Sequence, residues 1–184
     1  MLPKSHPDLL PVHGENDILP EHLDTPVADL LRFHNLVAPL RSAGRPRLAI
    51  ATCIDPRIVL RLPRGFAYVL RTPSIEVDTM DFALAYAAGV AAVAAICVLG
   101  HDECGLVDLG GQRDAFVTGL ALKAGWSREA ADECFDRSKD RFVVGDSIEN
   151  VRTKTAWLRE RFPRMRVAPL FYGVREGRLL QVRE

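Results

Sequence analysis

Two short clusters of polar residues have the composition of a metal site. The first contains Cys53, Asp55 and Arg57 in the pattern Cys-x-Asp-x-Arg, and the second contains His101 and Cys104 in the pattern His-x-x-Cys-Gly. Two thiolates and one imidazole form a borderline-soft ligand set that suits zinc. Three protein ligands would leave the fourth tetrahedral position for water or substrate, as in catalytic zinc sites. Each cluster alone is a weak signal, but the combination predicts one zinc ion per chain.

The spacing of Asp55 and Arg57 permits a carboxylate and a guanidinium group to pair through two parallel hydrogen bonds. Such a pair would fix the aspartate and lower its pKa. The aspartate could then ligate zinc itself or accept a hydrogen bond from zinc-bound water. An ordinary ion pair in a turn is the alternative interpretation, and the neighbouring cysteine and histidine ligands favour the catalytic one.

The remaining cysteines and histidines are not well placed to complete the site. Cys97 falls inside an apolar run, where a buried cysteine is common, and Cys134 falls on an expected helix far along the chain. Asp102 and Glu103, between the proposed ligands, are expected to face solvent or a partner. A surface or packing role is expected for the other four histidines, which are His6, His13, His22 and His34.

Apolar runs precede both clusters and predict the strands that position them. Residues 47–53 and 66–71 are short and rich in strand formers, and residues 91–99 are apolar on both faces, as in the middle of a parallel sheet. Residues 166–172 predict a fourth strand, and the turn after Gly173 predicts a final antiparallel one. Because parallel strands carry their ligand sites at their carboxyl ends, we expect the two clusters to meet.

Helical patterns alternate with these strands. Thr25-Pro26 is expected to open a helix that ends before Pro39, and Asp78 to cap a helix over 79–88. Ser127 is expected to cap a short helix through Arg137. Asp146 and Glu149 form a capping-box pattern for a longer helix that reaches about residue 162.

This alternation predicts an α/β fold. We expect a mostly parallel central β-sheet, with about four parallel strands plus an antiparallel edge strand, flanked by helices. Residues 1–25 contain four prolines and show no periodicity, which predicts an extended N-terminal arm. Residues 26–184 are expected to form a single domain.

Composition and charge disfavour several function classes. The chain has 24 basic and 24 acidic residues, so it lacks the positive field that nucleic-acid binding requires. The apolar stretch 82–100 contains Gly89 and is flanked by aspartates, which favours a buried helix and strand over a membrane span. The N-terminus shows no continuous apolar segment of a secretory signal, and four cysteines are too few for a disulfide scaffold. We expect a cytoplasmic protein with reduced thiols and a small-molecule substrate.

The paired motifs resemble those of the β-class carbonic anhydrases, whose signature combines Cys-x-Asp-x-Arg with His-x-x-Cys. The match is strong over residues 47–58 and 93–106 and looser, in the order of elements, over 47–183. Residues 1–25 have no counterpart in it. A cysteine-nucleophile enzyme is disfavoured, because Cys53 is not in a phosphate-cradling loop and the chain has no Cys-x-x-Cys pair.

The resemblance implies a zinc ion on Cys53, His101 and Cys104, with an Asp55–Arg57 dyad beside it. It also implies a homodimer or larger even-numbered oligomer. The implied reaction is the reversible hydration of carbon dioxide to bicarbonate: zinc lowers the pKa of its water to roughly 7, and the resulting hydroxide attacks the carbon. In the active form Arg57 would hold Asp55 away from the metal. If that pair breaks, Asp55 could take the fourth position and close the site.

Two departures from the family pattern lie where the pocket should be. Family members usually have Ser or Ala between the aspartate and the arginine, whereas Pro56 here fixes φ and favours an extended backbone before it. After the second strand they usually read Arg-Asn-Ala-Gly, whereas this chain has Arg71-Thr72-Pro73-Ser74 and so lacks the glycine and a backbone donor. Three functions stay open: carbon dioxide hydration, hydrolysis of carbonyl sulfide or carbon disulfide on the same site, and a zinc-binding paralogue without anhydrase activity.

Overall fold

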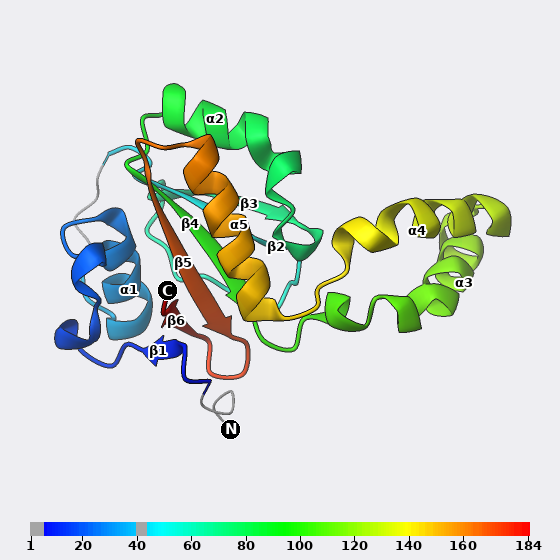
Figure 1. The fold of residues 1–184 in the computed structure, drawn as a ribbon, viewed down its shortest axis with the longest axis horizontal. Coiled ribbons are helices and arrows are strands. Elements are labelled where there is room, and N and C mark those ends of the chain that lie inside the picture. The colour runs from blue at the N-terminus through cyan, green and yellow to red at the C-terminus, as the bar shows by residue number, and fades with distance from the viewer. Residues whose placement is uncertain (1–5, 40–43) are drawn as a thin grey trace.

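A six-stranded sheet forms the centre of the computed structural model, which describes residues 6–39 and 44–184 (Figure 1). The strand order is β1-β6-β5-β4-β2-β3. The strands β3, β2, β4 and β5 run parallel to one another, and β6 is antiparallel to β5. The strands are β1 (Leu9–Pro11), β2 (Leu48–Cys53), β3 (Ala67–Thr72), β4 (Ala95–His101), β5 (Arg166–Gly173) and β6 (Arg178–Val182). The predicted mostly parallel α/β sheet with four parallel strands is therefore confirmed.

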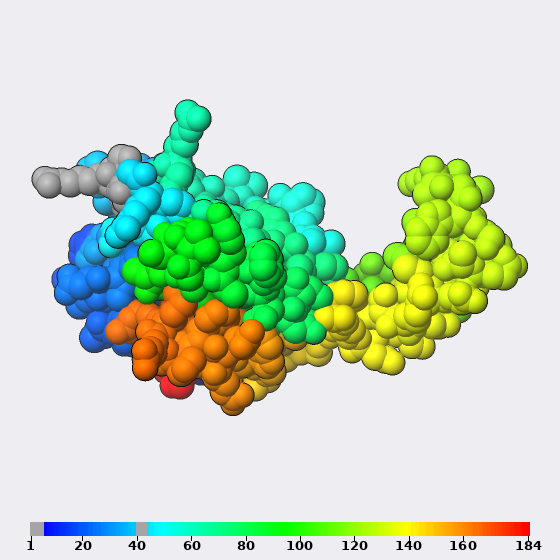
Figure 2. Space-filling view, turned by 90° about the horizontal axis from the view of Figure 1, so that it is seen from above, coloured from blue at the N-terminus to red at the C-terminus, as the bar shows by residue number. Residues whose placement is uncertain are grey.

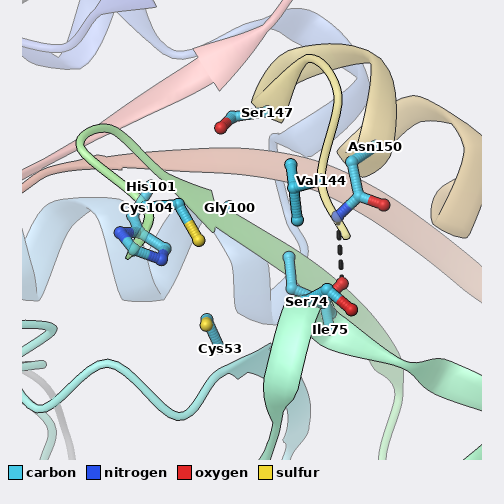
Figure 3. A pocket seen from close by; sticks show the side chains of 9 residues that line it. All are labelled: Cys53, Ser74, Ile75, Gly100, His101, Cys104, Val144, Ser147 and Asn150. Atoms are coloured by element: carbon cyan, nitrogen blue, oxygen red, sulfur yellow. Dashed lines mark hydrogen bonds between the residues drawn. The ribbon is translucent and has the colours of Figure 1, made fainter. Parts of the chain in front are cut away.

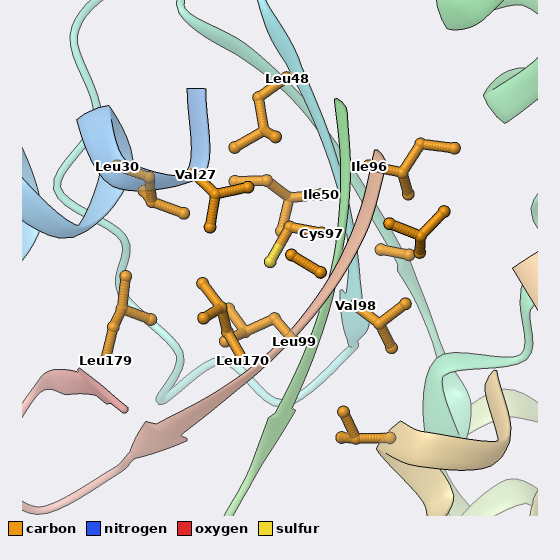
Figure 4. Packing of buried hydrophobic residues seen from close by; sticks show 14 of the residues in the cluster. Val27, Leu30, Leu48, Ile50, Ile96, Cys97, Val98, Leu99, Leu170 and Leu179 are labelled. Carbon is orange, nitrogen blue, oxygen red and sulfur yellow. The ribbon is translucent and has the colours of Figure 1, made fainter. Parts of the chain in front are cut away.

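The two strands that carry the metal-site residues are buried along their whole length. Their side chains alternate between the two faces of the sheet. In Figure 4, Ile50 and Leu99 point toward α1 (Pro26–Leu36), whereas Ile96 and Val98 point to the opposite side, where α5 (Ser147–Arg161) lies. Helices thus cover both faces, which explains why β4 reads as a continuous apolar run.

The remaining helices are α2 (Asp81–Gly89), α3 (Arg113–Ala124) and α4 (Arg128–Phe142). Three predicted caps are present: the side chains of Thr25, Ser127 and Asp146 accept backbone N–H groups at the starts of α1, α4 and α5. Asp78 does not cap α2, because a short 3-10 turn over Val77–Met80 precedes that helix. No helix within the described residues is both long and apolar enough to span a membrane.

The helices α3 and α4 form a hairpin that projects from the rest of the molecule (Figure 2). Sequence patterns predict only a short helix up to Arg137 in this region, whereas α4 continues to Phe142 and α3 is an additional helix. The side chains that the hairpin buries are Val117, Ala131 and Phe135. None of the three belongs to the main hydrophobic core. The hairpin therefore has little apolar support from its own chain.

The N-terminal segment contributes a strand to the sheet. Residues 1–25 were expected to form an extended arm, and within the described part β1 pairs antiparallel with β6 and becomes the edge strand. Gln181 of β6 is fully buried and holds the turn that follows β1. Its Oε1 accepts from the Leu19 N–H at 2.8 Å, and its Nε2 donates to the Asp17 carbonyl at 2.9 Å. The arm segment thus packs against its own sheet.

Candidate metal centre

Cys53, His101 and Cys104 meet where the parallel strands reach their carboxyl ends, a border of the sheet that we call the metal edge (Figure 3). Cys53 is the last residue of β2 and His101 is the last residue of β4, and these strands are parallel neighbours. Cys104 follows in the loop after β4. The two Sγ atoms and a ring nitrogen of His101 lie within 4.8 Å of one another. Cys53 and His101 are each only 2% exposed, so the cluster is closed to bulk water on the sheet side.

One nitrogen of His101 is free to bind a metal. Its Nδ1 lies 2.8 Å from the carbonyl oxygen of Asp102, which can only accept a hydrogen bond, so Nδ1 carries the proton. Its Nε2 is buried and has no hydrogen-bond partner among the described residues. A buried imidazole nitrogen without a partner is costly unless a ligand occupies it. Metal-binding histidines commonly donate their other N–H to a carbonyl in this way.

The two thiols lie side by side, with their Sγ atoms within 4.8 Å of each other. The neighbouring Cys104 and His101 lower the pKa of Cys53, although burial acts in the opposite direction. The neighbouring Cys53 sulfur and burial raise the pKa of Cys104. The pair thus favours one thiolate beside one thiol, and a cation would displace the remaining proton. Two sulfurs and one unprotonated imidazole nitrogen fit a zinc ion.

Asp55 and Arg57 form the pair that their spacing permits. Arg57 donates from Nε to Oδ1 at 3.0 Å and from one terminal nitrogen to Oδ2 at 2.7 Å, and its backbone N–H donates to Oδ1 at 2.9 Å. These bonds lower the pKa of Asp55 to about 2. Oδ2 lies 3.9 Å from Nδ1 of His101. Pro56 therefore does not prevent the dyad from forming beside the three proposed ligands.

Arg71 is a residue whose role the sequence did not indicate. Its guanidinium group donates to the carbonyl oxygens of Cys53, Asp55 and Ile58 at 3.2, 3.1 and 2.7 Å. It therefore fixes the backbone of the loop that carries the dyad. The only available signal was its place near the end of β3, the neighbour of β2, because arginines there can reach carbonyls across the sheet edge.

The residues between the proposed ligands make contacts that the sequence did not indicate. Asp102 and Glu103 were expected to face solvent or a partner, and Glu103 is exposed whereas Asp102 is half-buried. Oδ1 of Asp102 accepts from the Val174 N–H at 2.7 Å, and Glu103 contacts Arg57 and Arg175. Both residues tie the ligand loop to neighbouring loops of the same chain.

A small cavity adjoins the cluster. Its volume is about 10 Å³, close to the smallest space that holds one water molecule. One wall is formed by Ser74 and Ile75, both in left-handed backbone conformation with φ of 51° and 58°. This conformation is unfavourable for a β-branched residue. Asn150 of α5 supports the wall by donating to the Ser74 carbonyl at 2.9 Å. Val144 and Ser147 complete the lining opposite the metal-site residues.

Comparison with known proteins defines the fold. The sequence matches no family model and no curated protein. The structure is similar to β-carbonic anhydrase isoform I from Trichomonas vaginalis, with a TM-score of 0.59 and 20% identity over 90% of this chain and 99% of that one. It is equally similar to a carbonic anhydrase from Streptococcus mutans, with a TM-score of 0.59 and 22% identity over 90% and 99% of the two chains. A carbon disulfide hydrolase matches with a TM-score of 0.55 and 19% identity over 89% and 91%. The chain thus has the β-carbonic anhydrase fold.

Proposed function

We propose that this chain, which has the fold of the β-carbonic anhydrases, binds one zinc ion and catalyses the reversible hydration of carbon dioxide to bicarbonate. The observation that carries the proposal is the cluster of Cys53, His101 and Cys104, whose ligand atoms lie within 4.8 Å beside an ion-paired aspartate. Zinc held by these residues would act as a Lewis acid and supply an activated water near neutral pH. Three protein ligands would leave one position free for that water.

Asp55 and Arg57 would control access to this position. With a pKa of about 2, the Asp55 carboxylate is ionised at every physiological pH, so its oxygens act only as hydrogen-bond acceptors. It would orient the reacting water by accepting one of its hydrogens. Arg57 holds both carboxylate oxygens and would keep them from the metal.

The cavity beside the proposed ligands has room for about one water molecule, so it would exclude bulk water. Ile75 and Val144 supply apolar surface next to the proposed ligands. Ser147 and Asn150 belong to the first turn of α5, whose N-terminal end carries partial positive charge. That end would favour the anionic product over the neutral substrate.

The proposal includes a homodimer or larger even-numbered oligomer. Leu122 and Trp126 on the α3–α4 hairpin are 80% and 44% exposed, and the hairpin makes few apolar contacts with its own chain. A second copy would cover such surface. A reducing compartment such as the cytoplasm would keep the two thiols available for the metal.

Hydrolysis of carbonyl sulfide or carbon disulfide is a second candidate. The similarity in fold to a carbon disulfide hydrolase supports it. The third possibility is a zinc-binding protein without anhydrase activity. The left-handed Ser74-Ile75 wall, where family members usually have a glycine, supports that interpretation.

Stopped-flow measurement of carbon dioxide hydration tests the proposal. Zinc-loaded protein should hydrate carbon dioxide, and Asp55→Asn should lower kcat/KM by at least about tenfold, the low end for loss of a residue that supports a metal site. Asp114→Asn, the same change on the exposed start of α3, is the matched control and should have no effect. Hydrolysis of carbon disulfide or carbonyl sulfide without hydration of carbon dioxide would replace the first candidate by the second. Zinc-loaded protein that is inactive toward all three would contradict both.

A further inference from the structure

Glu103 holds Arg57 by two different groups. The Glu103 carbonyl oxygen accepts from a terminal nitrogen of Arg57 at 2.7 Å, and its carboxylate oxygen Oε2 lies 3.4 Å from the other terminal nitrogen. Its second carboxylate oxygen contacts Arg175. A chain of alternating charges therefore runs from Asp55 through Arg57 and Glu103 to Arg175. It joins the loop after β2, the loop after β4 and the turn between β5 and β6.

The backbone of Glu103 is shaped for this contact. Its φ is 51°, a left-handed conformation that residues with a Cβ seldom adopt. In this conformation both its carbonyl oxygen and its carboxylate reach Arg57. Backbone conformations of this kind persist where surrounding contacts hold them, and they concentrate at functional sites.

We propose that Glu103 is a positioning residue that, together with Arg175, keeps Arg57 paired with Asp55 and so disfavours movement of Asp55 onto the metal. This inference rests on the proposed function, because a closed site has meaning only where zinc is bound. To reach the fourth metal position, Asp55 must leave Arg57 or draw it along. The Arg57 guanidinium group is tied to the loop between His101 and Cys104. Zinc bound to both ends of that loop would hold it in place, so Arg57 could not follow Asp55.

The exposure of these side chains sets the size of the effect. The Asp55 side chain is 12% exposed, whereas those of Arg57, Glu103 and Arg175 are 45%, 39% and 62% exposed. Ion pairs with this exposure are weak and are screened by salt. Removing the Glu103 carboxylate should therefore raise the frequency with which the dyad opens by about two- to fivefold.

Nitrogen-15 NMR of the metal-free protein measures this opening directly. The Arg57 Nε–H, which donates to Asp55, should exchange with water about two- to fivefold faster in Glu103→Gln. Arg175→Gln should give a smaller change in the same direction, and the double variant should not exceed Glu103→Gln alone. The Arg161 Nε–H, bonded to Asp81 at 2.8 Å, is the internal reference, and Glu129→Gln on α4 is the charge control. Unchanged Arg57 exchange in Glu103→Gln would overturn the inference.

A second readout uses the metal-loaded protein. With cobalt(II) in the site, the dissociation constant for azide should rise in Glu103→Gln by up to about fivefold, because closed molecules offer no free position. Raised salt should reduce the difference from wild type. An azide affinity equal to that of wild type at low salt would contradict the inference. If the protein binds no metal, the proposed function fails, while the NMR result still decides whether Glu103 positions Arg57.

Discussion

The metal edge of the sheet and the α3–α4 hairpin differ in how far their side chains are buried and held by contacts within the chain. At the metal edge, fully buried strands end in Cys53 and His101, and loops tied by Arg71 and Glu103 carry the other polar groups. The hairpin instead buries only a few apolar side chains against itself and leaves Leu122 largely exposed. The chain alone therefore brings the proposed ligands together, whereas the hairpin has little apolar contact with the rest of the chain.

Replacing a cysteine in each region gives the largest expected contrast. Cys104→Ala should weaken zinc binding by about 100-fold or more, because it removes a ligand and leaves an incomplete set. Cys134→Ala on α4 should leave zinc content unchanged, since Cys134 is half-buried and remote from the cluster. Metal content after dialysis measures both. Equal zinc loss in the two variants would break the contrast.

Replacing one glycine by alanine in each region tests how tightly that region is packed. A Cβ on Gly100 of β4 would lie 2.3 Å from Cγ2 of Val151, so Gly100→Ala should lower the free energy of unfolding by about 1–3 kcal/mol. Gly119 of α3 has no atom within 4 Å of such a Cβ. Gly119→Ala should raise stability by about 0.5–1 kcal/mol through its helix propensity. Urea unfolding tests both changes, and destabilisation by Gly119→Ala would show that the hairpin is packed more tightly than the structure indicates.

Charges on the exposed face of the hairpin test its dependence on a second copy. Introducing Leu122→Lys and Trp126→Lys together should raise the oligomer dissociation constant at least tenfold, or about 1.4 kcal/mol. Lys123→Ala, at the exposed position between them, is the control. Sedimentation velocity gives the populations. A monomeric wild-type protein, or an oligomer that tolerates both lysines, would remove the hairpin from the interface.

The pH dependence of stability tests a buried histidine of α1. His34 is 3% exposed; its Nδ1 accepts the Arg61 N–H and its Nε2 donates to the Gly177 carbonyl, so the ring is neutral. Burial lowers its pKa. The unfolded chain takes up this proton near pH 6.5, so the stabilisation is complete above that pH and is lost as pH falls toward the folded pKa.

The slope of unfolding free energy against pH should therefore be positive below about pH 6.5 and at most about 1.4 kcal/mol per pH unit from this residue. In His34→Asn the slope should be shallower. His22, whose pKa is also lowered by burial, would maintain part of it. Urea unfolding of metal-free protein between pH 5 and about 7 measures the difference, and identical slopes would exclude His34 as the source.

The sheet was predictable because its strands carry a strong local signal. β2 and β4 are apolar on both faces, and parallel neighbours bring Cys53 and His101 to the same edge. β1 was not predicted, since it has three residues and its pairing comes from β6. α3 was missed because a helix with one buried residue, Val117, shows no clear apolar period.

The surroundings of the proposed ligands were less predictable than the ligands. The contacts of Arg71, Asp102 and Glu103 depend on the path of three loops, which local sequence does not determine. The consecutive left-handed residues Ser74 and Ile75 could not be foreseen either, since both residue types normally avoid that conformation. Sequence motifs thus indicate which atoms would bind the metal, and the tertiary structure determines what surrounds them.

X-ray absorption spectroscopy of the zinc-loaded protein tests the central claim most directly. We predict one zinc per chain with two sulfur ligands at about 2.3 Å and two lighter ligands at about 2.0–2.1 Å, one from His101 and one from solvent. The Cys53→Ser variant should lose one sulfur from that shell. A shell of four protein sulfur and nitrogen ligands, or one of oxygen alone, would contradict a three-ligand catalytic zinc at this edge of the sheet.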